Sequence, residues 1–143
     1  MLFRSEEGYI VNISSLYGLI APPGQTAYAA SKFAVRGFST ALRHELQGTG
    51  IGVTTVHPGG VATSIARSAR VPKGIPAEEM EKRRRMVEAL LTMPPETAGE
   101  IIVRGVERRK ARVLVGTDAK IASIIERLFP SSYWKLIGRR RTL

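Results

Sequence analysis

The chain has 143 residues, of which 43% are hydrophobic, so it is long and apolar enough for one domain with a buried core. It contains no cysteine, which excludes disulfides, thiolate metal sites and a cysteine nucleophile, and which favours a reducing compartment. The net charge is +10, and most of the excess lies in residues 104–143, with 11 basic and 3 acidic residues. Because no apolar run has the length of a signal peptide or membrane span, we expect a cytoplasmic protein.

The first elements predicted along the chain are a strand, a loop and a long helix. Residues 8–14 (GYIVNIS) are short and rich in β-branched side chains, as in a buried strand. Residues 16–24 (LYGLIAPPG) contain paired prolines and two glycines, which predict a loop. From residue 27 to residue 47, apolar side chains recur at helical spacing, with Thr26 as the expected cap and GTG at residues 48–50 as the stop.

A second buried strand is predicted at residues 51–58 (IGVTTVHP). A strand, a helix of about twenty residues and another strand are typical of a parallel βαβ unit, so the fold class is α/β. We expect an irregular segment, two helices, a short strand and a last helix in the remainder, at residues 60–76, 76–91, 93–110, 111–116 and 118–129.

Three polar side chains in the first half form a pattern suited to acid–base chemistry at a carbonyl group. Tyr28 and Lys32 are four residues apart on the predicted helix, so their side chains share one face. An ammonium group beside a phenol stabilises the phenolate, which makes Tyr28 usable as an acid and a base. Ser15 ends the strand, thirteen residues before Tyr28, and can hydrogen-bond a substrate carbonyl oxygen. Alone, a tyrosine four residues before a lysine is most often structural, so the surrounding motifs decide.

Three segments around these residues resemble the short-chain dehydrogenase/reductase family. GYIVNISSLYG resembles its strand and serine segment, YAASKFAVRGF its YxxxK helix, and HPGGVATSI its PGxVxT cofactor loop. With the helices that follow, the resemblance covers almost the whole chain. It implies the C-terminal half of a doubly wound, Rossmann-like parallel sheet with flanking helices. It also implies an NAD(P)-dependent oxidoreductase that acts on the CH–OH or carbonyl group of an alcohol, ketone or aldehyde.

The resemblance assigns catalytic roles to three residues. Ser15, rather than Ser14, matches the catalytic serine, because it lies thirteen residues before the tyrosine. Tyr28 matches the acid/base. Lys32 matches the lysine that both tunes this tyrosine and hydrogen-bonds the nicotinamide ribose, so Tyr28 and Lys32 are also expected to contact the cofactor.

The resemblance also implies a cofactor loop after the second strand. Pro58 and Gly59 match the turn that lets the backbone approach the cofactor. Val61 resembles the residue whose main chain meets the carboxamide, and Thr63 resembles the hydroxyl that binds the carboxamide or phosphate. The cofactor is expected to be NAD or NADP, without a choice between them.

The sequence departs from the family at its start. A dinucleotide fold begins with a strand and a glycine-rich turn that holds the pyrophosphate, and neither is present here. We expect an N-terminal dinucleotide-binding half of about 100 to 130 residues to be missing, at roughly 30 residues per βαβ unit. A gene fragment or misassigned start is favoured over a piece of a larger polypeptide or a natural short protein without activity. Such a chain alone is expected to bind a dinucleotide poorly and to turn over little.

The partial domain spans residues 1–143 and divides into four functional segments. The catalytic strand, helix and strand occupy residues 8–59, a substrate and cofactor lid residues 60–92, a closing helix, strand and helix residues 93–128, and a basic aromatic tail residues 129–143. Side chains expected to contact substrate from the lid are Arg67, Arg70, Val71 and Met86. The apolar loop residues Leu16, Leu19, Ile20 and Ala21 indicate a hydrophobic pocket, and therefore a lipophilic substrate.

Two further readings concern partners. The tail sequence FPSSYWKLIGRRRTL has the composition of an interfacial helix, which is consistent with contact to a membrane surface, although packing on the core or on a second subunit is favoured. The competing function is a non-catalytic basic binding module that uses this tail.

The family resemblance implies a homo-dimer or homo-tetramer. No nucleic acid and no metal are expected, because the basic residues match no recognition motif and His44 and His57 lack a third ligand.

Overall fold

The computed structural model describes residues 7–64, 68, 74 and 76–138, which include a parallel sheet of three strands. The strands are β1 (Glu7–Ile13), β2 (Gly50–Pro58) and β3 (Arg112–Val115), in the order β1-β2-β3. Ile13 pairs with Val56, and Pro58 pairs with Val115. Because all three strands run in the same direction, the segments that follow their carboxyl ends lie together at one end of the sheet.

The described helices confirm the four predicted ones, with ends that differ by a few residues, and add two short helices, one of them in the predicted loop. They are η1 (Leu16–Gly18), α1 (Thr26–Glu45), α3 (Ala77–Glu88), α4 (Pro95–Glu107), α5 (Thr117–Leu128) and α6 (Tyr133–Ile137). The predicted cap of α1 is wrong. Thr26 is the first helical residue, and Gln25 precedes it as the N-cap without a side-chain hydrogen bond.

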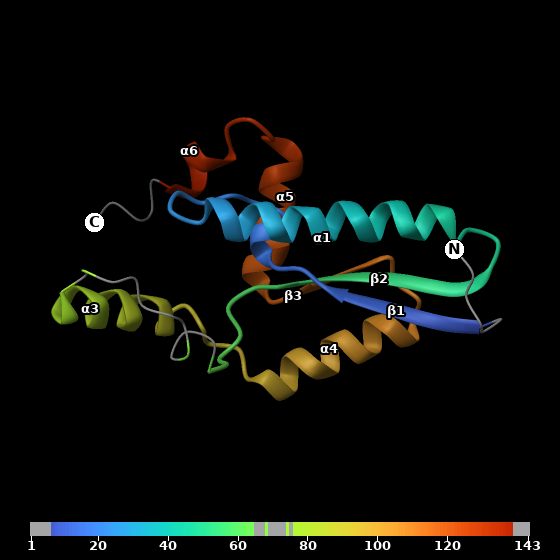
Figure 1. Ribbon diagram of the computed structural model, residues 1–143, viewed down its shortest axis with the longest axis horizontal. Coiled ribbons are helices and arrows are strands. Elements are labelled where there is room, and N and C mark those ends of the chain that lie inside the picture. The colour runs from blue at the N-terminus through green and yellow to red at the C-terminus, as the bar shows by residue number, and fades with distance from the viewer. Residues whose placement is uncertain (1–6, 65–67, 69–73, 75, 139–143) are drawn as a thin grey trace.

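Helices cover both faces of the sheet. In Figure 1, α1 lies along one face and α4 along the other, with α5 on the same side as α1. Successive residues of β2 point to opposite faces, so Val53 packs with Leu42 of α1 and with Leu46, which caps this helix. Val56 packs with Val113 beneath α4. The fold is therefore a doubly covered parallel sheet, as predicted.

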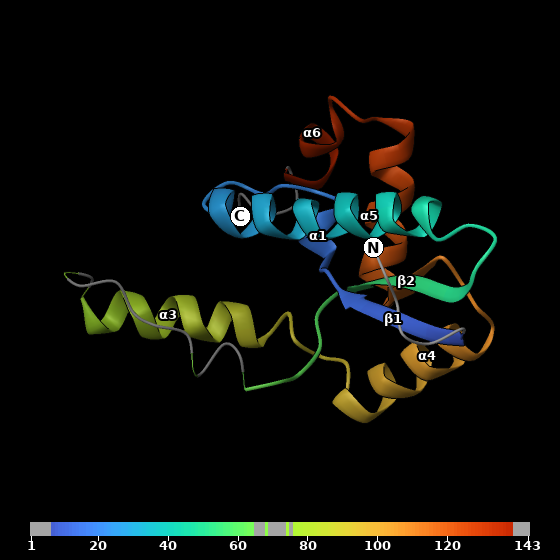
Figure 2. The ribbon, with the colours of Figure 1, turned by 45° about the vertical axis from the view of Figure 1, so that its right-hand side comes forward.

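The region after β2 is arranged differently. Figure 2 shows α3 standing clear of the sheet, connected to α4 by a short segment. The expected substrate contacts Arg67, Arg70 and Val71 lie outside the described residues. Met86 on α3 is 63% exposed, and within the described residues no helix is long and apolar enough to cross a membrane.

Candidate active site

The serine segment follows directly on β1 and is held against α1. Ser14 extends the ladder by donating its N–H to the Val56 carbonyl, at 2.8 Å. Its buried hydroxyl donates to the Lys32 carbonyl of α1, also at 2.8 Å. Ser15 then starts η1, and its hydroxyl oxygen accepts from the Tyr17 N–H at 3.2 Å. Of the two serines, Ser14 is therefore the structural one, and Ser15 is half-buried at the start of the turn.

Tyr28 and Lys32 lie one turn apart on the face of α1 that meets this segment. The Lys32 Nζ atom is 5.6 Å from the centre of the Tyr28 ring, and it donates to the Ile13 carbonyl at 3.3 Å. Tyr28 remains 40% exposed. The ring of Tyr17, a residue the sequence reasoning did not select, meets the Tyr28 ring edge-on with centroids 6.1 Å apart.

These contacts connect the three predicted catalytic residues through neighbouring residues. Ser15 contacts Tyr17, Tyr17 contacts Tyr28, Tyr28 lies beside Lys32, and Lys32 bonds to Ile13, two residues before Ser15. The Tyr28 phenol and the Lys32 ammonium therefore lie together beside the segment that follows β1 and carries the Ser15 hydroxyl. Such a set can hydrogen-bond a carbonyl oxygen and exchange a proton with it.

The predicted cofactor loop follows β2 at this same carboxyl end of the sheet. Gly59 donates its N–H to the Val115 carbonyl at 2.9 Å, and Gly60 donates to the Asp118 carboxylate at 2.8 Å. Val61 forms a bridge with Met93. An added Cβ atom at Gly60 would overlap the Leu90 backbone carbonyl, so this position requires glycine. A Cβ atom at Gly59 would overlap the Asp118 carboxylate and displace that side chain. The sequence reasoning did not select Asp118, whose carboxylate holds the loop from the start of α5.

His57 connects the cofactor loop to the serine segment. It lies fully buried immediately before Pro58, and its Nδ1 is 2.9 Å from the Ser15 carbonyl oxygen. A carbonyl only accepts, so Nδ1 carries the proton and Nε2 is an unprotonated acceptor. Nε2 is buried and has no hydrogen-bond partner among the described residues. His57 therefore positions the backbone of Ser15.

Burial is the main effect that lowers the pKa of His57 below its ordinary value of 6.5. The hydrogen bond to the Ser15 carbonyl raises this pKa, and the charges of Arg36 and Arg112 lower it. Protonation therefore favours the unfolded chain, so His57 should reduce the free energy of unfolding as the pH falls from 6.5 toward its folded-state pKa. His57→Asn keeps an N–H donor without a titrating group. We expect the melting temperature of this variant to fall less between pH 7.5 and 5.5 than that of the parent chain. Equal pH dependence of both would contradict this role.

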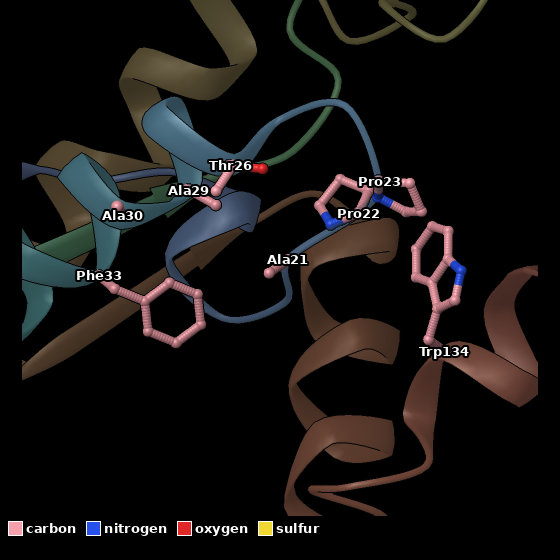
Figure 3. A pocket seen from close by; sticks show the side chains of 8 residues that line it. All are labelled: Ala21, Pro22, Pro23, Thr26, Ala29, Ala30, Phe33 and Trp134. Atoms are coloured by element: carbon pink, nitrogen blue, oxygen red, sulfur yellow. The ribbon is translucent and has the colours of Figure 1, made fainter.

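The predicted hydrophobic pocket is corrected by the structure. Leu19 and Ile20 are 0% and 4% exposed and belong to the core, because the loop turns inward after η1. Ala21 instead lines an open hollow of about 450 Å³ beside α1. Figure 3 shows Trp134 of α6 across from Pro22 and Pro23.

The described part of the tail packs on this same loop. The Tyr133 hydroxyl accepts a hydrogen bond from the Ala21 N–H at 3.0 Å. Together with Trp134 beside the paired prolines, this contact fixes α6 against the segment that joins Ser15 to Tyr28. The described part of the tail therefore contacts a loop of the same chain, and contact of the tail with a membrane surface stays a prediction.

Known proteins resemble this chain in sequence. The short chain dehydrogenase family profile matches residues 1–73. SadH of Mycobacterium tuberculosis is 47% identical over 140 residues, which are 96% of this chain and 50% of that protein. Oxidoreductase BOA17 of Botryotinia fuckeliana is 35% identical over 127 residues, 83% of this chain and 46% of the relative. The chain thus spans about half the length of the curated relatives it matches.

Solved structures share the fold. A short chain dehydrogenase/reductase from Burkholderia phymatum in complex with NAD superposes with a TM-score of 0.72 at 22% identity, covering 86% of this chain and 48% of that one. A short chain dehydrogenase from Burkholderia cenocepacia in complex with NADP gives 0.64 at 22% identity, covering 96% and 48%.

Proposed function

Because the chain belongs to the short-chain dehydrogenase family, we propose that it supplies the catalytic half of an NAD(P)-dependent oxidoreductase that acts on an alcohol or carbonyl group. The observation that carries the proposal is the Lys32 Nζ atom 5.6 Å from the ring of an exposed Tyr28, beside the serine segment. The proposed catalytic residues are Ser15, Tyr28 and Lys32. The substrate is proposed to be lipophilic, in keeping with the apolar hollow beside Ala21.

In the direction of reduction, each of these side chains has a separate task. Ser15 donates a hydrogen bond to the carbonyl oxygen of the substrate and orients it. Tyr28 gives its hydroxyl proton to that oxygen as the carbonyl carbon becomes tetrahedral, and Lys32 stabilises the negative charge left on the phenolate. In oxidation, the phenolate takes the proton back from the alcohol.

The residues present suit the nicotinamide end of a dinucleotide. The Lys32 Nζ atom donates one hydrogen bond to a described residue, Ile13. Because a lysine ammonium has three N–H donors, donors are left for a ribose hydroxyl. The loop of Pro58, Gly59 and Val61 follows β2 at the carboxyl end of the sheet, where Lys32 also lies, and Thr63 is exposed. When bound, the dinucleotide supplies or accepts the hydride. The sequence contains no Gly-x-Gly-x-x-Gly turn, the motif that holds the pyrophosphate of a dinucleotide in Rossmann-like folds.

The assembly is proposed to be a homo-dimer or homo-tetramer. The outer surface of α1 carries exposed aromatic side chains, Phe33 and Phe38, the latter 59% exposed. Large apolar groups in water are typical of surfaces that associate.

A chimera tests the proposed function directly. Residues 1–143 would replace the matching half of SadH, so that the relative supplies the part this chain does not cover. We expect the chimera to oxidise NADH or NADPH in the presence of a panel of lipophilic ketones and aldehydes, and residues 1–143 alone to show little turnover. A folded chimera that binds the dinucleotide but reduces none of the panel would contradict the proposal.

A further inference from the structure

A second hollow, of about 370 Å³, lies at the open edge of β3, between α4 and α5. It shares no residue with the candidate active site. Its lining combines an apolar floor with cationic side chains, and the cationic members are Arg104, Arg108, Lys110, Arg112 and Lys120.

These cations are hardly neutralised by the protein itself. Arg104 pairs with Glu100 at 3.2 Å, and both side chains are about two-thirds exposed. The other four cations of the hollow form no ion pair with any described residue. Like charges held around one concavity repel one another, and an anion placed among them removes that cost.

The backbone adds uncharged donors to the same place. Thr55 donates to the carbonyl of Ala111, just before β3, and Gly59 donates to the Val115 carbonyl, so alternate residues along this segment bond to β2. In a parallel ladder the residues between them direct their N–H and C=O groups the other way. The N–H groups of Arg112 and Leu114, both lining residues, therefore face the open edge.

The end of α4 is built to bring the cations together. Arg109 has a left-handed φ of 48°, and the Lys110 N–H bonds to the Gly105 carbonyl at 3.0 Å, as in a Schellman motif. This turn satisfies the last carbonyls of the helix and passes the chain directly into β3. Gly105 permits the close approach, because a Cβ there would overlap the Val113 side chain.

We propose that this hollow binds a phosphate-bearing anion, and that its arginines and lysines donate hydrogen bonds to the phosphate oxygens. Arginine forks suit phosphate geometry, and several cations require more than one negative charge. The volume lies at the small end of the range for ligand pockets, which favours a compact organic phosphate. The lining has no aromatic side chain on which a base of a nucleic acid would stack.

The test measures binding of inorganic pyrophosphate to the 143-residue chain by calorimetry in low salt. We expect Arg108→Gln combined with Lys120→Gln, which removes one cation from each wall, to weaken binding at least tenfold. The control combines Lys82→Gln with Arg84→Gln on α3, removes the same charge and should change binding less than twofold. Circular dichroism verifies that each variant is folded. Absence of binding, or equal weakening by the control, would overturn the site.

Two further arms identify the source of the phosphate. Soluble inositol trisphosphate and vesicles that contain phosphatidylinositol bisphosphate present the same chemistry in free and membrane-bound form. Binding of either one with the same dependence on Arg108 and Lys120 supports the site and names its source. Binding of duplex DNA that is tighter than pyrophosphate, and equally weakened by the α3 control, would replace the site with a diffuse basic surface. None of these measurements depends on turnover.

Discussion

In the chimera with SadH, Tyr28→Phe is expected to lower turnover about a thousandfold at saturating substrate and dinucleotide, because it removes the proton donor and leaves the ring. The Tyr28 ring, and not its hydroxyl, makes the contacts with Tyr17 and Lys32, so phenylalanine preserves the packing. The melting temperature should therefore change little. The measurement is the rate of NADH or NADPH oxidation with a ketone that the parent chimera reduces.

A second tyrosine provides the matched control. The Tyr9 hydroxyl lies 3.0 Å from the Thr54 hydroxyl, within the sheet and away from the serine segment. Tyr9→Phe should cost about 1 kcal/mol of stability through this hydrogen bond, and it should leave turnover within about twofold. A Tyr28→Phe chimera that retains more than a tenth of the parent rate would show that another group moves the proton.

Gly18→Ala is expected to destabilise the chain by about 2 to 3 kcal/mol and to disturb the site at the same time. A Cβ at this position would overlap the Ser14 hydroxyl and lie 2.8 Å from the Lys32 carbonyl oxygen. The hydrogen bond that joins Ser14 to Lys32 would break, and η1 would separate from α1. Lys32 and Tyr28 would then shift relative to Ser15, so the chimera should also lose activity.

The control for this substitution is a glycine on another helix, α1. Gly37 of α1 has no atom within 4 Å of a built Cβ, and alanine is a better helix former than glycine. Gly37→Ala should therefore stabilise the chain by about 0.5 to 1 kcal/mol. Urea unfolding of both variants makes the comparison, and a Gly18→Ala chain as stable as the parent would contradict the tight contact.

Periodicity and local motifs were sufficient to predict the strands, the helices and the parallel arrangement. The β-branched runs around Ile13 and Val56 were sufficient to predict both strands. The prediction that both are buried is right for β2 but wrong for β1, in which no residue is buried and Ile13 is 48% exposed. Tyr28 and Lys32 could be placed together because helical spacing alone decides which side chains share a face.

The long-range contacts that support the site could not be predicted in this way. Asp118 reaches Gly60 across 58 residues, and Tyr133 reaches Ala21 across 112 residues. No local pattern specifies such pairs, since they arise only when tertiary packing brings the segments together. His57 was identified only as an isolated histidine, because its bond to the Ser15 carbonyl depends on the register of β1 and β2.

The failed expectation for Leu19 and Ile20 has a similar cause. Their apolar character is consistent both with a substrate pocket and with a core, and composition does not distinguish the two. The turn of η1 buries them, and the open hollow is formed instead with Trp134 from the far end of the described chain. The shape of this hollow depends on a contact between distant segments.

The most direct test of the account is a double-mutant cycle of Tyr28→Phe and Lys32→Met in the chimera, measured as single-turnover rates at saturating dinucleotide. Each variant alone should slow the proton-coupled step, and the double variant should be no slower than Tyr28→Phe alone, because the lysine cation acts on the chemical step through the phenol. Rate losses that multiply would mean that the two side chains act independently, which would contradict the central claim.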